Sequence, residues 1–267
     1  PHGESQRVID VVEEGWPQLV VDTGADFRLS DPGRAESAYG PHTRSDLLGS
    51  FACGLADVAG DTLAGATRVA VPGCFATAAM LSLWPLSSVL DAASHPVCWA
   101  ATGSSGSGAT AKAGTHHPFR AHNFYGYSLT GHRHEAELDE RLVEWCGPEA
   151  PTCSLLTHSA PIVRGIHATL RVRFDDPIED PMALVHAAWN GRPFVHALDD
   201  PPRLASVVGT NHAHTHAVAR HEGREVLVLT VIDNLLKGAA GQAVQTMNLA
   251  LELGETTGLE HPGMSPC

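Results

Sequence analysis

The chain has 267 residues, of which 43% are hydrophobic and 18% are charged. These fractions are ordinary for a globular protein that buries a sizeable core, and they exclude an intrinsically disordered chain. Seventeen lysines and arginines stand against thirty acidic residues, which gives a formal net charge of −13. This balance argues against binding to nucleic acid or to an anionic membrane surface.

The length suits two interleaved domains in one chain. No apolar run approaches the roughly 20 residues that span a bilayer, and no signal peptide opens the chain. We therefore expect a cytoplasmic protein. The chain begins at Pro1 and runs at once into a helix-like pattern, so we expect a fragment whose upstream segment is missing.

The N-terminal part has the pattern of half a doubly wound α/β unit. Residues 5–14 have helical spacing that ends at Gly15-Trp16-Pro17, and residues 18–22 form a short apolar strand of the buried parallel kind. Residues 23–61 are rich in Gly, Asp, Ser and Pro, so we expect surface loops there. Residues 68–71 predict a second buried strand.

A helix with the apolar density of a core element follows at 75–84, where Pro85 ends it. Beyond it the pattern changes to β-type segments, with helices at 134–145 and 181–190 and a long final helix at 234–251. The sequence therefore predicts an α+β unit with a mostly antiparallel sheet and helices on one side. The expected strands are 97–102, 124–129, 169–174, 205–209, 214–219 and 226–232.

Cys74 is the best candidate for a nucleophile. It stands at the end of a strand and directly before a helix, where backbone N–H groups and the helix dipole lower a thiol pKa. The same position also suits a small buried core residue. The sequence has six cysteines without CxxC spacing, so it predicts neither a disulfide framework nor a zinc knuckle, and most of them should be buried and inert: Cys53, Cys74, Cys98, Cys146, Cys153 and Cys267.

A second constellation runs from Gly131 to Glu137 and contains two imidazoles, a guanidinium and carboxylates at a predicted strand-to-helix junction. A thiol needs a base, and an acyl phosphate needs a cation. Glu137 lies three residues after His134, on the same helix face, and could orient it. The alternative is a solvated, charged helix start.

Two further patterns carry weaker signals. The glycine-rich stretch 102–108 follows a strand, so its backbone could approach a phosphate, but it matches neither GxGxxG nor the phosphate-binding loop and also suits a surface loop. His212, His214 and His216 alternate along a predicted strand. No carboxylate or thiol completes a ligand set beside them, so we assign no metal here, nor at His116-His117.

Taken together, these motifs resemble the N-acetyl-γ-glutamyl-phosphate reductase family over nearly the whole chain. The motifs that carry the resemblance are Pro1-His2-Gly3, Asp26-Phe27-Arg28-Leu29, Pro72-Gly73-Cys74, Gly131-His132-Arg133-His134, Arg164-Gly165 and the run IDNLLKGAAGQAVQTMN. Their joint order and spacing is specific. The resemblance implies NADPH as cofactor and an acyl phosphate as substrate, with a thioester on Cys74 that is reduced to an aldehyde.

The resemblance also implies roles for individual residues. His134 is the expected acid and base, and the expected substrate-binding residues are His132, Arg133, Glu137 and Arg164. The residues expected to line NADPH are Ser105, Gly106, Asn234, Leu235, Lys237, Gly241 and Gln242. Asn234 is expected beside the nicotinamide carboxamide.

In fold, the resemblance implies a Rossmann-type nucleotide-binding domain, whose N-terminal part precedes Pro1, and a catalytic and dimerisation domain of the α+β class. The expected boundaries are 1–73 for the remainder of the nucleotide domain and 74–233 for the catalytic domain. Residues 234–267 would form a helix and tail that return to the nucleotide domain. A homodimer or homotetramer is expected.

The sequence departs from the arginine-biosynthetic pattern near the nucleophile, where Phe75 and Ala76 replace the usual Tyr-Pro, and at 51–57. The stretch AKAGTHHPFR followed by GHRHEAE looks more like the branch that reduces aminoadipyl or glutamyl phosphates attached to an acidic amino-group carrier protein. We therefore expect a carrier-bound substrate, as in lysine or arginine biosynthesis. Docking would need a basic patch, for which Arg28, Arg34, Arg44, Lys112 and Arg120 are available.

Three alternatives stay open. The first is N-acetyl-γ-glutamyl-phosphate reductase of arginine biosynthesis itself. The second is aspartate-semialdehyde dehydrogenase, against which the His-Arg-His motif and the run DNLLKGAAGQA count. The third is a non-catalytic binding or regulatory module that lacks its nucleotide domain, against which the presence of Cys74 and His134 counts.

Overall fold

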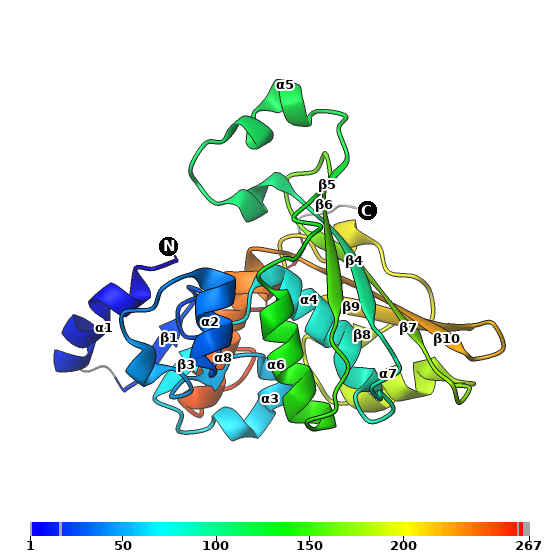
Figure 1. Cartoon of the computed structure of the whole chain (residues 1–267), viewed down its shortest axis with the longest axis horizontal. Coiled ribbons are helices and arrows are strands. Elements are labelled where there is room, and N and C mark those ends of the chain that lie inside the picture. The colour runs from blue at the N-terminus through cyan, green and yellow to red at the C-terminus, as the bar shows by residue number, and fades with distance from the viewer. Residues whose placement is uncertain (1, 16–17, 261, 264–267) are drawn as a thin grey trace.

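A computed structural model of the chain describes residues 2–15, 18–260 and 262–263. Pro1, Trp16-Pro17 and Cys267, which the sequence analysis names, lie outside these residues. The described chain contains two sheets, one of three strands and one of seven, with helices between and around them (Figure 1). No helix of the described residues is long and apolar enough to cross a membrane.

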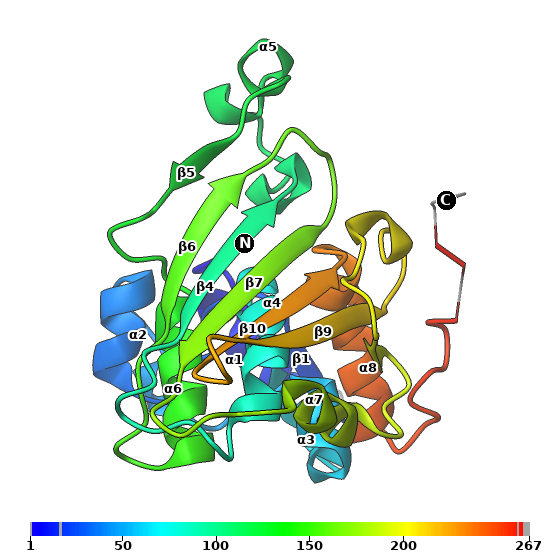
Figure 2. The same cartoon turned by 90° about the vertical axis from the view of Figure 1, so that its right-hand side faces the viewer.

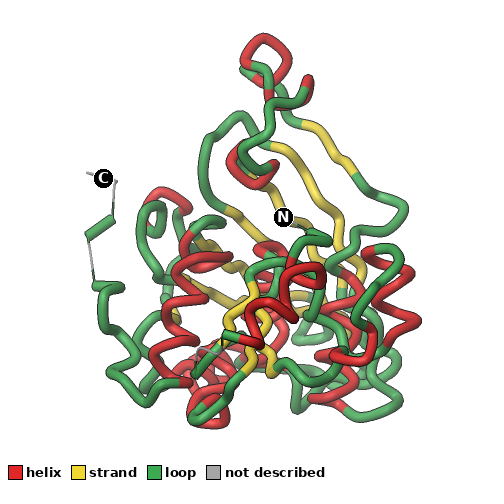
Figure 3. The backbone as a smooth tube through the Cα atoms, turned by 90° about the vertical axis from the view of Figure 1, so that its left-hand side faces the viewer, coloured by secondary structure: helices red, strands yellow, loops and turns green. Residues whose placement is uncertain are grey.

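The small sheet is parallel and has the strand order β1-β3-β2, with β1 at Val20–Asp22, β2 at Ala52–Cys53 and β3 at Arg68–Ala70. Helix α1 (Ser5–Glu14) precedes this sheet in the chain and lies on the side of the molecule that Figure 3 shows. A small cluster of buried residues, centred on the stacked rings of Phe27 and Phe51, packs beside these strands. The strands of this sheet have only two or three residues, and β3 leads through Pro72-Gly73 into Cys74.

The large sheet is mixed, with the order β5-β6-β4-β7-β10-β9-β8. The pairings β5–β6, β4–β7, β7–β10 and β10–β9 are antiparallel, whereas β4–β6 and β8–β9 are parallel. The expectation of a mostly antiparallel sheet is confirmed. The strands are β4 (Val97–Thr102), β5 (Tyr125–Tyr127), β6 (Ser154–Ser159), β7 (Ile166–Arg173), β8 (Val195–Ala197), β9 (Ala213–Arg220) and β10 (Glu225–Ile232).

Helices cover one face of this sheet and leave the other open (Figure 2). The main covering helices are α4 (Cys74–Leu83) and α7 (Pro181–Trp189), and α6 (Glu135–Cys146) packs against α4. Register shows the asymmetry directly. On the covered face one row across neighbouring strands is fully buried, and it consists of Leu155, Cys98, Leu170, Val228 and Ala217.

The next row, on the open face, is only partly buried or exposed. It consists of Leu156, Trp99, Thr169, Leu229 and His216. Trp99 exposes 39% of its surface. An apolar side chain of this size in the middle of a sheet face marks a surface suited to association.

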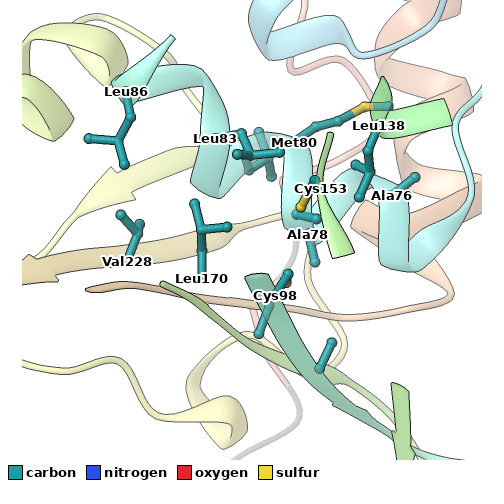
Figure 4. Packing of buried hydrophobic residues seen from close by; sticks show 14 of the residues in the cluster. Ala76, Ala78, Met80, Leu83, Leu86, Cys98, Leu138, Cys153, Leu170 and Val228 are labelled. Carbon is teal, nitrogen blue, oxygen red and sulfur yellow. The ribbon is translucent and has the colours of Figure 1, made fainter. Parts of the chain in front are cut away.

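The main core lies between α4 and the large sheet. Leu83 of α4 lies on the side of Leu170 and Val228 of the strands, and Met80 of α4 points toward Leu138 of α6 (Figure 4). Helix α4 is buried almost all round, and apart from Thr77 and Ser82 its residues after Cys74 are apolar, so it has no polar stripe. This burial fixes the position of the Cys74 end of the helix.

The chain returns to the small sheet at its end. Strand β10 leads into a π-turn at Leu236–Ala240 and then into α8 (Gly241–Ala250), which contacts β1, α3 (Ala56–Ala59) and the 3₁₀ turn Gly60–Leu63. The Gly65 N–H donates to the Ala250 carbonyl at 3.0 Å. The two sheets are therefore joined both at Gly73-Cys74 and through α8.

Most predicted elements are confirmed within one to three residues, but two predictions are wrong. Residues 205–209 form no strand, because the chain makes a 3₁₀ turn at Leu204–Ser206 and Gly209 has a φ of +83°. Residues 23–61 are not only loops, since α2 (Pro32–Tyr39) forms there. Asp31 caps this helix by accepting from the Arg34 N–H, and Pro32 stands at its first position, where proline is favoured.

Candidate active site

A pocket of about 600 Å³ lies where β3, α4 and the large sheet meet. Cys74, His132 and His134 line it, together with Arg133 and Arg28. The far wall comes from segments remote in sequence. They include Ser105, Gly106, Asn234 and Leu235. The structure therefore brings together both of the predicted catalytic residues and parts of both predicted binding sets.

Cys74 is the first residue of α4 and is partly exposed to the pocket. The π-turn packs so tightly against it that a Cβ added at Gly238 would lie 2.7 Å from the Cys74 Cβ. Burial raises the pKa of the Cys74 thiol, and the charge of Arg28 and the Phe75 N–H offset only part of this rise. The sequence-based expectation of a lowered pKa is therefore wrong, because desolvation outweighs the helix terminus here.

His134 is buried against the residue that precedes the nucleophile candidate. A Cβ added at Gly73 would lie 2.3 Å from His134 Nε2, so only glycine leaves room for the imidazole. Burial lowers the pKa of His134 well below its ordinary value, and nearby positive groups, Arg28 first, lower it further. A neutral imidazole at this place can accept a proton at neutral pH.

His132 sits closer to the rim and supports His134. Its Nδ1 accepts from the His134 backbone N–H at 3.2 Å, and the two rings meet edge to face at 4.6 Å between centroids. Burial and the charge of Arg133 lower the pKa of His132 to about 4. Arg133 itself is exposed and lies over the Tyr39 ring.

Glu137 does not line the pocket; it braces the pocket from behind. Its Oε2 accepts from the Gly73 N–H at 2.9 Å, and its Oε1 accepts from Arg28 at 3.1 Å and from the Tyr39 hydroxyl. His134 Nε2 lies 3.8 Å from the same Oε1. One buried carboxylate thus ties α6 to Arg28 and to the backbone next to Cys74.

The glycine-rich stretch meets Asn234 at the opposite wall. Asn234 is almost fully buried, its Nδ2 donates to Ser105 Oγ at 3.0 Å, and its Oδ1 accepts from the Gly165 N–H at 2.6 Å. Ser105 Oγ also donates to the Val163 carbonyl at 2.7 Å. A Cβ added at Gly106 would lie 3.4 Å from Thr102 Oγ1, which is an ordinary van der Waals contact. Asn234 keeps one amide hydrogen for a ligand.

The remaining predicted residues do not line the pocket. Arg164 pairs with Asp233 at 3.0 Å behind the wall. Lys237 is fully buried, with its ammonium on Asp57 and 2.7 Å from Gln245 Oε1. Gln242 donates to the Gly54 carbonyl at 3.0 Å, and Gly241 packs against Asn211. These residues hold the π-turn and α8 in place, so their effect on the pocket is indirect.

Several pocket residues were not assigned a site role from the sequence. Arg28 and Lys112 were considered only for a surface patch, as was Arg120, and His2 and Tyr127 were given no role. The sequence did contain a signal for a cationic site, because residues 92–134 contain no Asp or Glu although the chain has a net charge of −13. None of the described residues that line the pocket is acidic. The pocket is therefore cationic within an acidic protein, which suits an anionic ligand.

Arg120 shapes the mouth of the pocket. It is buried, donates to Ser159 Oγ and to the Ala160 carbonyl at 2.5 Å each, and keeps an Nε without a hydrogen-bond partner. It is the last residue of the short helix α5 (His117–Arg120), which belongs to an arm that projects from the large sheet (Figure 1). The guanidinium thus anchors this arm to the ends of β4 and β6.

Of the three alternating histidines, His214 and His216 lie on β9, and His212 directly precedes it. His212 and His214 contact His196 of β8. His196 Nε2 and His212 Nδ1 are 2.8 Å apart, and the rings of His196 and His214 lie 5.6 Å apart. Within residues 2–15, 18–260 and 262–263, no group of three or more His, Cys, Asp or Glu side chains is arranged to hold a metal ion.

Comparison with known proteins places this geometry in a family. Residues 74–234 match the family described as semialdehyde dehydrogenase, dimerisation domain. The chain is 40% identical over 274 residues to the N-acetyl-gamma-glutamyl-phosphate reductase of Desulforudis audaxviator, covering all of this chain and 78% of that protein. The protein of the same name from Methanobrevibacter smithii is 36% identical, with the same coverage.

Solved structures agree in fold. Aspartate semialdehyde dehydrogenase II from Vibrio cholerae superposes with a TM-score of 0.67 at 15% identity, over 92% of this chain and 76% of that one. The aspartate semialdehyde dehydrogenase from Francisella tularensis gives 0.66 at 14% identity, over 93% and 79%. The full-length sequence identity and the matched domain together show that the chain is an oxidoreductase that belongs to the N-acetyl-gamma-glutamyl-phosphate reductase family.

Proposed function

We propose that the chain carries out the reductive dephosphorylation of an acyl phosphate to an aldehyde through a thioester on Cys74. The observation that carries this proposal is the cationic pocket that both Cys74 and His134 line. The names of its relatives support an N-acylated γ-glutamyl phosphate as the substrate.

The first half of the reaction needs a thiolate, an electrophile and a leaving group. The thiol proton of Cys74 passes to the neutral imidazole of His134, and the sulfur attacks the acyl carbon. The C–O bond to phosphate breaks and inorganic phosphate leaves with the bonding pair, which gives the thioester. Arg28 and Arg133 supply positive charge where the phosphate leaves, and this charge stabilises the developing anion.

The second half of the reaction regenerates the free thiol of Cys74. NADPH, when bound, would supply the hydride that reduces the thioester carbon. The oxygen of the resulting hemithioacetal would take up a proton. Its collapse releases the aldehyde and frees Cys74 as a thiol. His134 holds the proton that it received in the first half and returns it during these steps.

The wall formed by Ser105, Gly106 and Asn234 fits the nicotinamide end of such a cofactor. Gly106 and Asn234 both line the pocket, Gly106 has no side chain, and the Asn234 amide retains one hydrogen. Leu235 adds an apolar surface at the same wall. We assign these four residues to the cofactor, whereas Lys237, Gly241 and Gln242 support the wall from behind.

We also propose that two or more copies associate through the open face of the large sheet. The matched family is described as a dimerisation domain, and it spans the strands of this sheet. On this face, Trp99 is exposed and Leu156 and Leu229 of the same row are partly exposed.

A second candidate substrate is an acyl phosphate tethered to an acidic carrier protein. The arm at the pocket mouth favours it, because Lys112 lines the mouth while Phe119 and Phe124 expose 66% and 60% of their surfaces nearby. Arg44 does not contribute to this mouth, since it pairs with Asp10 and Asp46. A tethered substrate needs an open mouth, whereas a free N-acetyl substrate can be enclosed.

The test compares the two substrates in one assay, with each acyl phosphate generated by its kinase and the reaction followed by the loss of NADPH absorbance. We expect the Cys74→Ala variant to form no aldehyde from either, and normal turnover by that variant would refute the thioester. A higher kcat/KM for the carrier-bound compound would identify the tethered substrate, because remote contacts contribute to transition-state binding. A higher value for N-acetylglutamyl phosphate would identify the free one.

A further inference from the structure

A second cavity, of about 480 Å³, lies between the small sheet and α6. It shares no lining residue with the catalytic pocket. Most of its lining comes from β2, α3, the turn that follows α3, and the junction of α4 with α6. Its volume lies in the range of about 300–1,000 Å³ that is usual for small-molecule sites.

Much of the lining of this cavity is apolar and aromatic. Phe51, Leu55 and Leu63 line it, together with Trp84 and Trp145, whose indole rings meet edge to face at 5.2 Å. Leu55 and Leu63 are almost fully buried, so this part of the lining belongs to the packed core. The apolar lining can take an aliphatic or aromatic group of a few carbon atoms.

The lining also includes Arg141 and Glu144, and the Arg141 guanidinium pairs with both Glu144 and Glu140. Arg141 Nη2 lies 2.8 Å from Glu140 Oε1, and Arg141 Nη1 pairs with Glu144. The side chains of Arg141 and Glu140 expose only 15% and 14% of their surfaces, whereas Glu144 exposes 57%. Glu140 is held in place because it also accepts from Ser30 N–H and Oγ at 3.0 Å.

These three groups differ in how freely they can bind a ligand. Arg141 is fixed and still has N–H donors for a carboxylate. Glu144 is solvated and is held only by an exposed ion pair of small worth, so it can turn to meet an ammonium group. Two carboxylates and one guanidinium give this group a net charge of −1, which disfavours a simple anion. The positive charge of Arg141 disfavours a simple cation.

We propose that this cavity is a second ligand site that takes a free α-amino acid with an aliphatic or aromatic side chain. Arg141 binds the carboxylate, Glu144 binds the ammonium group, and the side chain enters the space between Leu55, Leu63 and the two tryptophans. The site lies beside the catalytic pocket and not within it, so the assignment stands independently of the reaction at Cys74.

Isothermal titration calorimetry of the chain with L-leucine and with L-phenylalanine tests this assignment. Two analogues of leucine serve as chemical controls: isocaproate lacks the ammonium group, and isopentylamine lacks the carboxylate. We expect at least one of the amino acids to bind, and both analogues to bind at least roughly tenfold more weakly, since each loses one charge-assisted contact.

Protein variants locate the binding. Arg141→Met should weaken amino-acid binding by roughly 10–100-fold, the equivalent of a lost hydrogen bond to a charged group. Glu144→Gln removes an exposed charge, so the fold is retained, and it should weaken amino-acid binding while leaving isocaproate unaffected or improved. Glu149→Gln makes the same chemical change at an exposed residue outside the cavity and should alter nothing.

Three results would overturn the proposal. The first is no heat of binding from either amino acid at concentrations up to about 10 mM. The second is binding that Arg141→Met and Glu144→Gln leave unchanged, which would put the ligand elsewhere. The third is isocaproate binding as tightly as leucine, which would make the cavity a carboxylate site and not an amino-acid site.

Discussion

Burial acts in opposite directions on the two reacting groups of the pocket. It raises the pKa of the Cys74 thiol and lowers the pKa of the His134 imidazole. At neutral pH the free protein therefore holds a neutral pair, and not a thiolate beside an imidazolium. Proton transfer from sulfur to His134 then belongs to the attack itself, which makes the imidazole essential to the chemical step.

Replacing this imidazole should slow the chemical step strongly. We expect His134→Asn to lower kcat by roughly 10²–10⁴, the usual scale for the loss of a general acid or base. His132→Asn is the matched control, because it makes the same change in a half-buried ring that only accepts from the His134 backbone. Steady-state measurement of kcat for both variants tests this prediction. A larger loss of kcat for His132→Asn would make His132, and not His134, the acid and base.

At the scale of elements, the pocket is held by a contact between α6 and the residue that begins α4. Glu137 is buried, pairs with Arg28 and accepts from the Gly73 N–H. Breaking a buried pair leaves an uncompensated charge. Glu137→Ala should therefore lower the free energy of unfolding by about 3–5 kcal/mol, as measured by urea denaturation.

The matched control for this variant is Glu144→Ala on the same helix. Its carboxylate is mostly exposed and pairs with Arg141, and such surface pairs contribute only about 0–1 kcal/mol. Equal effects of the two alanine variants on the unfolding free energy would show that Glu137 is not the brace.

Sequence periodicity was sufficient for elements with a clear apolar pattern, and β4 was predicted at its observed bounds, Val97–Thr102. It failed for α2, whose only strong signals are Asp31 and Pro32, and for the edge strand β8, which has three residues. Cys74 and His134 could be singled out because the strand-to-helix position and the motif order are local, and the structure places both at the pocket. The burial of Lys237 and its ion pair with Asp57 could not be predicted from the sequence, because the pair joins residues 180 positions apart.

At the scale of the whole molecule, the open face of the large sheet is the surface with the largest expected effect on assembly. Trp99→Glu places a charge in the middle of its apolar row, so we expect sedimentation velocity to show a smaller species than for the unchanged protein. Val143→Glu is the control, since Val143 is similarly exposed, at 40%, but lies on α6. An unchanged sedimentation coefficient for Trp99→Glu would rule this face out as the interface.

The central claim, a thioester on Cys74, has a direct test that does not need turnover. The chain is mixed with the acyl phosphate in the absence of NADPH, quenched in acid and digested, and the peptides are weighed by mass spectrometry. We predict the acyl group on the Cys74 peptide, and none on the peptides of the buried Cys98 and Cys153. An unmodified Cys74 peptide, or an acyl group on another cysteine, would contradict the account.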